Sequence, residues 1–162
     1  NEKINIHSKN PKAIIESIDK HISINCNSFL WLCLVLQREM NKPLKGIHGI
    51  SSLYGIYGRK NRLPYSISKH AFEAVIKCLA TEFTQTQVLG YRPGFFETKL
   101  TSQNITETEL HNLMHRIPQK RLGLPIELSE VILSNMMNSI TYLSGICITI
   151  DGGMTSGGIF EI

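Results

Sequence analysis

This sequence of 162 residues lacks several features that would assign a chain to a class at first sight. Its first glycine is Gly46, and neither Gly-x-x-x-Gly-x-Gly nor Gly-x-Gly-x-x-Gly occurs, so it carries no loop of the kind that holds a pyrophosphate at a helix N-terminus. The longest apolar run covers residues 29–36, well short of the roughly 18 residues that a membrane-spanning helix needs. No signal-peptide pattern is present. We therefore expect a soluble chain with no membrane partner.

Paired short cysteine spacings and metal-binding motifs are also missing. The four cysteines stand in apolar surroundings and are Cys26, Cys33, Cys78 and Cys147. This pattern predicts buried free thiols in a reducing compartment, so we expect a cytoplasmic protein without disulfides. His111 and His115 lie four residues apart on a predicted helix, but no third ligand accompanies them, and we expect no metal.

The charge is modest and scattered. The net charge is +4, and the basic residues form only short clusters such as residues 59–62. Without a nucleic-acid-binding motif these clusters indicate solvated loop charges, so we expect no nucleic-acid partner. A hydrophobic fraction of 42% and a charged fraction of 19% are typical of a globular protein. Residues 1–162 are therefore predicted to form a single domain.

Helical and strand patterns follow one another along the chain. Apolar residues surround most of the helical wheel over residues 22–40, which predicts a helix buried on several sides. Further predicted helices cover residues 65–83, 105–117 and 126–138, and predicted strands cover residues 45–52, 87–91 and 146–150. Thr106 and Glu109 have the spacing of a capping box. The pattern favours the α/β class.

Three side chains that could take part in catalysis lie at or just before the predicted helix of residues 65–83. Ser52 ends a predicted strand, Tyr65 follows thirteen residues later, and Lys69 follows after four more. Positions i and i+4 share a helix face, and an ammonium near a phenol favours the phenolate. Such a tyrosine can exchange a proton with an alcohol or carbonyl oxygen, which Ser52 can also hydrogen-bond. A bare Tyr-x-x-x-Lys also arises by chance, with the tyrosine starting a helix and the lysine in solvent.

The segments Ile50-Ser51-Ser52-Leu53-Tyr54-Gly55 and Tyr65-Ser66-Ile67-Ser68-Lys69-His70-Ala71, with their separation, resemble the short-chain dehydrogenase/reductase family. The resemblance covers residues 22–153 and includes the Asp-Gly-Gly of residues 151–153. It implies the carboxyl-terminal part of a doubly wound, Rossmann-like parallel sheet flanked by helices. Residues 1–21 are then an irregular lead-in, with a short helix expected over residues 13–18, and residues 154–162 are a tail.

The resemblance implies a role for each residue of a catalytic set. Tyr65 would be the acid/base, Lys69 would lower its pKa and bind the ribose, and Ser52 would position the substrate oxygen. Asn25 would hold a water in a proton relay, although Asn27 is a neighbouring alternative and either residue can simply satisfy free helix donors. The implied cofactor-binding residues are Tyr65, Lys69, Pro93, Gly94, Phe96 and Thr98.

The same resemblance implies an oxidoreductase that transfers a hydride between a nicotinamide and a carbonyl or secondary alcohol. The Phe96 backbone would meet the carboxamide, and Thr98 would bond the carboxamide or a phosphate. The cofactor would be NAD or NADP, which the sequence does not distinguish. A homo-oligomer is implied, with the helices of residues 22–40 and 65–83 pairing with their copies across a two-fold axis.

The chain also departs from the family. About three strands are found where the family has about seven, and the strand of residues 87–91 is about two residues short, with Leu89-Gly90 in place of the usual run. The strand ending at Ser52 would then have an open edge. Either the chain is the carboxyl-terminal part of a longer protein, or its N-terminal residues do something that those of the family do not. The functional alternative to an oxidoreductase is a catalytically incompetent remnant that acts as an oligomerisation or interaction module. A serine hydrolase, the third hypothesis, lacks Gly-x-Ser-x-Gly.

Overall fold

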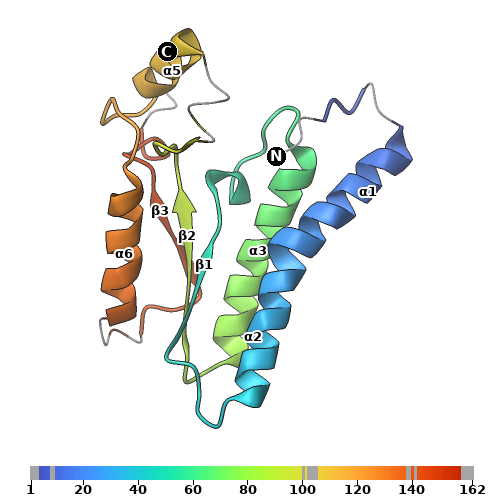
Figure 1. Ribbon diagram of the computed structural model, residues 1–162, viewed down its shortest axis with the longest axis vertical. Helices are drawn as coiled ribbons and strands as arrows, with labels where there is room; N and C mark the ends of the chain where they lie inside the picture. Colours follow the sequence, from blue (N-terminus) through green and yellow to red (C-terminus); the bar gives the residue numbers. More distant parts are fainter. Residues whose placement is uncertain are drawn as a thin grey trace. The chain divides into compact units, whose positions relative to one another are not determined.

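The computed structural model describes residues 4–7, 10–99, 101, 106–137, 140 and 142–157. It divides into two compact units, of which the first comprises residues 1–91 and 140–148 and the second residues 92–139 and 149–162. The elements in chain order (Figure 1) are α1 (Pro11–Ile22), η1 (Ser23–Asn27), α2 (Ser28–Glu39), β1 (Gly46–Ile50), η2 (Leu53–Gly55), α3 (Leu63–Glu82), β2 (Gln87–Pro93), α5 (Glu107–His115), α6 (Pro125–Met137) and β3 (Ile146–Ile150).

The chain enters a helix earlier than predicted. The Asn10 side chain accepts a hydrogen bond of 2.9 Å from the Lys12 amide, and Pro11 occupies the first helical turn, where its missing N–H costs nothing. The short helix expected over residues 13–18 is therefore present but longer, and the assignment of residues 1–21 as an irregular lead-in is wrong from residue 11 onward. A π-helical turn, η1, joins α1 to α2, and α2 gives way to extended backbone at Met40, before Pro43.

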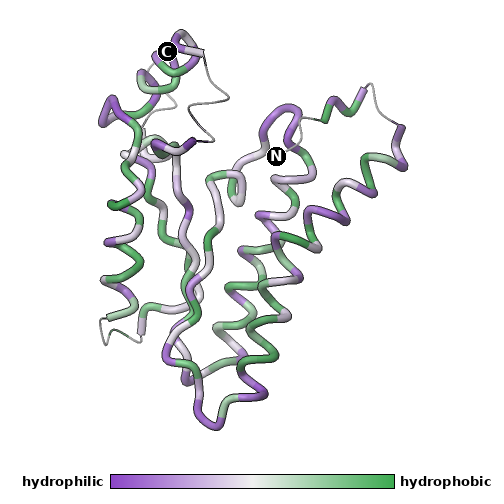
Figure 2. The backbone as a smooth tube through the Cα atoms, viewed as in Figure 1, coloured by the Kyte–Doolittle hydropathy of each residue, from purple (hydrophilic) through white to green (hydrophobic). Residues whose placement is uncertain are grey.

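The core of the first unit lies where α2 and α3 meet β1 and β2. Phe72 and Ile76 of α3 pack with Ile47, Val88 and Cys33, all of which are buried. The Phe29 and Phe72 rings add a contact at 4.8 Å between centroids. Figure 2 shows the apolar stretches along α2 and α3 that this packing draws together. Burial of these side chains positions α3, and with it the residues on its first two turns.

Strands β1, β2 and β3 follow one another in that order across the described sheet, with β1 at one edge. β1 and β2 are parallel, in a register that runs from Gly46 opposite Gln87 to Ile50 opposite Tyr91. The expected α/β class is confirmed, and so is the strand of residues 146–150. β2 is two residues longer than predicted, because its ladder continues through Pro93.

Gly90 explains the departure from the family pattern in β2. A Cβ atom at this position would lie 2.3 Å from the Cys147 sulfur and 3.4 Å from Ile76. The side chain of β3 thus occupies the space that any larger residue at position 90 would need. Cys78, by contrast with the predicted burial of the thiols, is exposed on α3.

The second unit is organised around the start of α6. Arg121 donates two hydrogen bonds, of 2.7 and 2.6 Å, to the Glu127 carboxylate, which also accepts one of 2.7 Å from the Leu124 amide. The predicted capping box of Thr106 and Glu109 is confirmed at the start of α5. Among the described residues, no helix is both long and apolar enough to cross a membrane.

Replacing Gly90 with alanine should destabilise the fold by about 1–3 kcal/mol, because the new methyl group overpacks the contact with Cys147. Urea denaturation followed by circular dichroism measures the change. The matched control is Gly58→Ala, since nothing lies within 4 Å of a Cβ atom there, and its effect should range from neutral to about 1 kcal/mol stabilising. Equal destabilisation by both variants would contradict the packing explanation.

The Arg121–Glu127 pair should make stability depend on pH in the acid range. The hydrogen bonds from Arg121 and Leu124 lower the pKa of Glu127 from 4.5 to about 2. Because the folded-state pKa is depressed, the stabilising contribution is present above pH 4.5 and is lost as the pH falls through 2. Denaturation midpoints across this range should show that loss in the wild type and a flatter dependence in Glu127→Gln.

Candidate active site

Ser52 leaves the end of β1 in a fixed conformation. The Ser51 amide donates a hydrogen bond of 2.7 Å to the Tyr91 carbonyl, which extends the β1–β2 ladder by one residue. Ser52 itself is extended and precedes η2, and its hydroxyl accepts a hydrogen bond of 3.3 Å from the Tyr54 amide. The serine therefore stands where the carboxyl ends of the strands meet, the usual ligand-binding edge of an open α/β sheet.

Tyr65 lies on the first turn of α3, half-buried and hydrogen-bonded to the Ser52 side chain. Its ring meets that of Tyr54 edge-on, at 5.9 Å between centroids. Burial raises the pKa of the Tyr65 phenol, and Tyr54 adds to the rise, while the Ser52 hydrogen bond and the charge of Arg62 oppose it. The net result is a phenol that holds its proton more tightly than a free tyrosine.

Lys69 lies one turn further on, on the same side of α3. Its Nζ is 5.8 Å from the centre of the Tyr65 ring and donates a hydrogen bond of 2.9 Å to the Ile50 carbonyl. Burial lowers the pKa of the Lys69 ammonium. The expected lowering of the Tyr65 pKa by Lys69 is thus not found: burial raises this pKa, the charge that opposes the rise is that of Arg62, and the Lys69 ammonium is hydrogen-bonded to the Ile50 carbonyl.

Asn25 reaches the same region through Ser68. Its amide nitrogen donates a hydrogen bond of 3.0 Å to the Ser68 hydroxyl, which donates one of 2.8 Å to the Tyr65 carbonyl. Asn25 lies in the π-helical turn η1, a kind of distortion that is frequent at functional sites. Asn27, the neighbouring alternative, is exposed, so of the two it is Asn25 that the structure connects to the Tyr65 turn.

Two residues beside this group, Ser51 and Glu73, were not predicted to belong to the site. The Ser51 hydroxyl donates a hydrogen bond of 2.8 Å to a carboxylate oxygen of Glu73, and both side chains are buried. The available signal was the spacing, because Glu73 follows Tyr65 by eight residues and so lies two turns along α3, close to the same face. Within the first unit, the structure therefore brings Ser52, Tyr65, Lys69 and Asn25 together.

The predicted nicotinamide-contacting residues Pro93, Gly94, Phe96 and Thr98 belong to the second unit. The Gly94 amide donates a hydrogen bond of 2.8 Å to the Ile150 carbonyl, and a Cβ atom on Gly94 would lie 2.8 Å from Asp151. This turn therefore requires glycine for a close approach of two backbone segments. Phe96 is buried beside Gly123, whereas Thr98 is exposed, with its hydroxyl 3.0 Å from that of Thr101.

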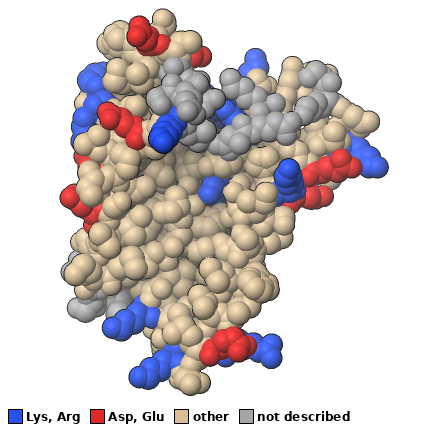
Figure 3. All heavy atoms as spheres, in the orientation of Figure 1, with Lys and Arg blue, Asp and Glu red and all other residues tan. Residues whose placement is uncertain are grey.

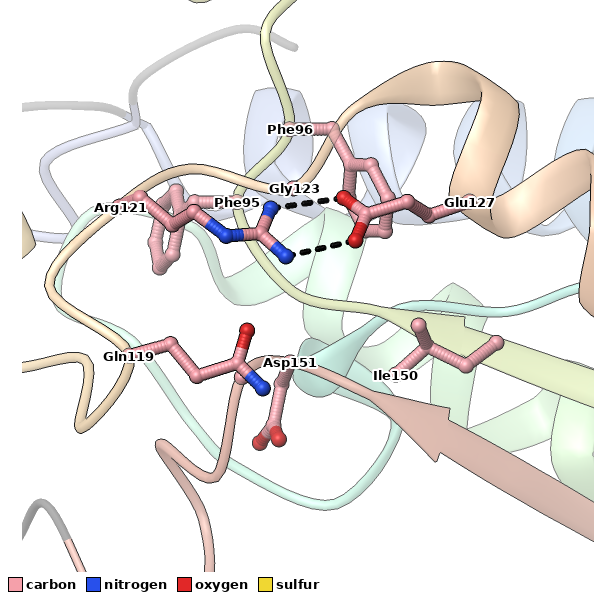
Figure 4. Close-up of a pocket in the computed structure, with 9 residues that line it drawn as sticks. Phe95, Phe96, Gln119, Arg121, Gly123, Glu127, Ile150 and Asp151 are labelled. Atoms are coloured by element: carbon pink, nitrogen blue, oxygen red, sulfur yellow. Dashed lines mark hydrogen bonds and ion pairs between the residues drawn. The ribbon is translucent and has the colours of Figure 1, made fainter.

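A pocket in the second unit (Figure 4) contains only one of the predicted site residues, Phe96. Arg121 and Glu127 face each other across the view, with Gln119 and Asp151 opposite them. The Asp151 carboxylate accepts hydrogen bonds from the amides of residues 153 and 155, at 3.0 and 2.8 Å. The charged groups that line the pocket thus have partners within the protein.

Figure 3 shows acidic and basic side chains dispersed over the visible face and separated by wide uncharged areas.

Residues 7–155 match the model of a protein family described as enoyl-(acyl carrier protein) reductase. The match starts before residue 22, the predicted beginning of the family-like part, so residues 7–21 also belong to that part of the chain. A 3-oxoacyl-[acyl-carrier-protein] reductase of Thermotoga maritima is 32% identical over 142 residues, which cover 86% of this chain and 57% of that protein. A 2-(R)-hydroxypropyl-CoM dehydrogenase of Xanthobacter autotrophicus is 25% identical over 146 residues, or 88% of this chain and 58% of that protein.

Solved structures agree with the sequence matches. One assigned as a short-chain alcohol dehydrogenase of Sinorhizobium meliloti superposes with a TM-score of 0.83 at 25% identity, over 96% of this chain and 62% of that one. The acetoin dehydrogenase of Enterobacter cloacae shares the fold, with a TM-score of 0.78 at 18% identity, over 94% of this chain and 60% of that one. The chain spans little more than half the length of the curated relatives named above. On these grounds the chain belongs to the short-chain dehydrogenase/reductase family, whose named members here are oxidoreductases.

Proposed function

We propose that the protein is an NAD(P)-dependent oxidoreductase that interconverts a carbonyl and a secondary alcohol. The observation that carries the proposal is the grouping of a serine hydroxyl, a phenol and an ammonium in the first unit. Ser52 is hydrogen-bonded to Tyr65, and the Lys69 ammonium lies 5.8 Å from the centre of the Tyr65 ring. A proton donor and a second hydroxyl aimed at one point are what protonation of a carbonyl oxygen requires.

Tyr65 is proposed as the group that moves the proton. The phenol is protonated at neutral pH, as an ordinary tyrosine is, and burial raises its pKa further, so it can donate to the oxygen of a carbonyl as that oxygen gains charge. Ser52, already bonded to the phenol, would donate to the same oxygen and orient it. This protonation state favours the reduction direction, and the opposite direction needs the phenolate.

Lys69 and Asn25 are proposed to support that proton transfer. The Lys69 ammonium is held by the Ile50 carbonyl within reach of the tyrosine ring, and a bound ribose would offer it further hydroxyl acceptors. A positive charge there would also stabilise the phenolate that remains once the proton has left. Asn25 is proposed to hold a relay water; its contact with Ser68 fixes the turn of α3 that begins at Tyr65.

The residues of this chain fit the nicotinamide end of a dinucleotide. Gly94 lacks a side chain at a turn where backbones approach closely, and Pro93, Phe96 and Thr98 stand in the same segment. We propose that this segment contacts the carboxamide, while Tyr65 and Lys69 contact the ribose. When bound, the nicotinamide supplies or accepts the hydride. No glycine-rich loop for the pyrophosphate occurs in the sequence.

The substrate class follows from the chemistry and from the relatives. The Thermotoga protein is named for reduction of a 3-oxoacyl group and the Xanthobacter protein for dehydrogenation of a hydroxypropyl group, so both names describe a carbonyl or a secondary alcohol. We propose the same pair of functional groups for this protein, in the cytoplasm. Neither name fixes the carrier or the chain attached to that group here.

The second candidate is an interaction module without catalysis. The turn η1 and helix α2 leave large apolar side chains in solvent, with Ile24 of η1 61% exposed and Trp31 and Leu34 of α2 65% and 50% exposed. Exposed apolar patches of this kind mark interaction surfaces. We propose a homo-oligomer in which α2 meets its copy, and this arrangement is compatible with either function. Cofactor binding separates the two candidates, because a module without catalysis has no need of it.

Tyr65→Phe should lower kcat for reduction of a carbonyl substrate by about a hundredfold or more, because it removes the proton donor while keeping the ring. The measurement is oxidation of NADH or NADPH against a panel of small ketones and 3-oxoacyl thioesters, using this chain and the longest reading frame that contains it. Tyr57→Phe is the control, since Tyr57 is exposed in the loop before α3. Full activity in Tyr65→Phe would contradict the proposed acid.

Lys69→Met should weaken cofactor binding and raise its KM severalfold, because it removes the charge proposed to bind the ribose while keeping much of the apolar stem. Fluorescence of the reduced nucleotide measures binding without turnover. Lys77→Met is the matched control on the same helix, where Lys77 is exposed. Wild-type protein that oligomerises but binds neither nucleotide would favour the interaction module.

A further inference from the structure

Glu73 is a buried carboxylate that the proposed reaction does not use. Its side chain is 4% exposed, and it accepts the 2.8 Å hydrogen bond from Ser51, which is 2% exposed. A buried carboxylate is unfavourable unless it is hydrogen-bonded, so both groups are strongly constrained to this geometry. The contact joins α3, which carries Tyr65 and Lys69, to the end of β1.

Gly55 encloses the contact from the other side. A Cβ atom on Gly55 would lie 2.3 Å from a Glu73 carboxylate oxygen and 2.8 Å from the Ser51 hydroxyl. The turn η2 therefore packs its backbone directly onto the Ser51–Glu73 pair, which is possible only for glycine at this position.

Ser52 lies between these two fixed points. Ser51 precedes it and is held by both Glu73 and the Tyr91 carbonyl, while the Gly55 amide donates a hydrogen bond of 2.9 Å back to the Ser52 carbonyl. Ser51 on one side of Ser52 and Gly55 on the other thus both contact the Glu73 carboxylate, Ser51 through its hydroxyl and Gly55 through close packing. A hydroxyl that must meet a reacting oxygen depends on such support, because small displacements weaken catalysis.

We propose that Glu73 is a positioning residue that holds the Ser52 hydroxyl against the Tyr65 phenol by anchoring Ser51 and Gly55. The proposal rests on the proposed function for its catalytic meaning, but the positioning is a property of the protein without substrate. A helix side chain thereby fixes the distance between the serine and tyrosine of the site.

The test is a pH titration of Tyr65 by NMR in protein labelled at the tyrosine Cζ, with Tyr65→Phe assigning the signal. The Ser52 hydrogen bond lowers the Tyr65 pKa, so Ser52→Ala should raise it by about one unit. Glu73→Ala should raise it similarly, through displacement of Ser52. Loss of a nearby negative charge alone would lower the pKa, so the sign separates positioning from a direct charge effect. The other groups that influence or face Tyr65 are Tyr54, Arg62 and Lys69, and none of them is altered.

The design includes a double variant and two controls. Glu73→Ala added to Ser52→Ala should produce no further rise, since both act through one hydroxyl. Glu73→Gln should not raise the Tyr65 pKa, because its amide oxygen still accepts from Ser51, and Glu82→Ala, on the exposed end of α3, should leave it unchanged. If Glu73→Ala does not fold by circular dichroism, Ser51→Ala replaces it with the same expected rise.

Two results would overturn the proposal. One is that Glu73→Ala does not raise the Tyr65 pKa, and the other is that Glu73→Ala raises this pKa as much in the Ser52→Ala protein as in the wild type. The outcome is independent of turnover. If the Tyr65 pKa depends on Glu73 through Ser52 in a protein that reduces no carbonyl, Glu73 remains a positioning residue but the proposed function is wrong. Turnover without the coupling would keep the function and remove the role of Glu73.

Discussion

The packing of α3 onto the β1–β2 pair is the constraint on which the rest of the first unit depends. Phe72 and Ile76 are buried against Ile47 and Val88, so α3 cannot rotate without exposing its apolar stripe. With the helix fixed in rotation, the turns before Phe72 present Tyr65 and Lys69 on the side where β1 ends. Hydrophobic burial, which has no directional preference of its own, thereby determines where polar chemistry can take place.

At Tyr65, burial and charge act in opposite directions. Desolvation favours the neutral phenol, whereas the Ser52 hydrogen bond and the Arg62 charge favour the phenolate, and desolvation prevails. At Lys69, burial favours the neutral amine, while the hydrogen bond to the Ile50 carbonyl stabilises the charged ammonium. A neutral acid beside a sequestered cation suits a step in which negative charge develops only when the proton leaves.

Much of this arrangement was predictable where it depends on neighbouring residues. The Tyr65–Lys69 spacing determines a shared helix face, and the capping box of Thr106 and Glu109 needs only four consecutive residues. Features that depend on distant partners were missed. The two extra residues of β2 depend on pairing with neighbouring strands. Glycine is needed at position 90 because Cys147, on another strand, fills the space beside it. Ser51 is hydrogen-bonded to Glu73, twenty-two positions away in the sequence.

The full length of α1 was missed for a different reason, since only residues 13–18 were expected to be helical. Its cap, Asn10 followed by Pro11, is a local signal of a helix N-terminus, but the polar residues around it obscured the amphipathic pattern. The pKa of Tyr65 was misjudged because a sequence specifies which charges are near in the chain but not how much water a fold removes. Spacing therefore predicts which groups meet, and only three-dimensional packing determines their protonation.

The π-helical turn at Ser23–Asn27 has a consequence for insertions and deletions in this part of the chain. One residue changes the phase of an α-helix by about 100°, so a π turn behaves as a single accommodated insertion within an otherwise continuous α1–α2 rod. Deleting a residue there would restore regular helical winding, but only by turning the Asn25 amide away from Ser68 or by rotating one helix against α3. The irregularity thus lets α1 pack against α3 and α2 pack against the core, each in its own helical phase.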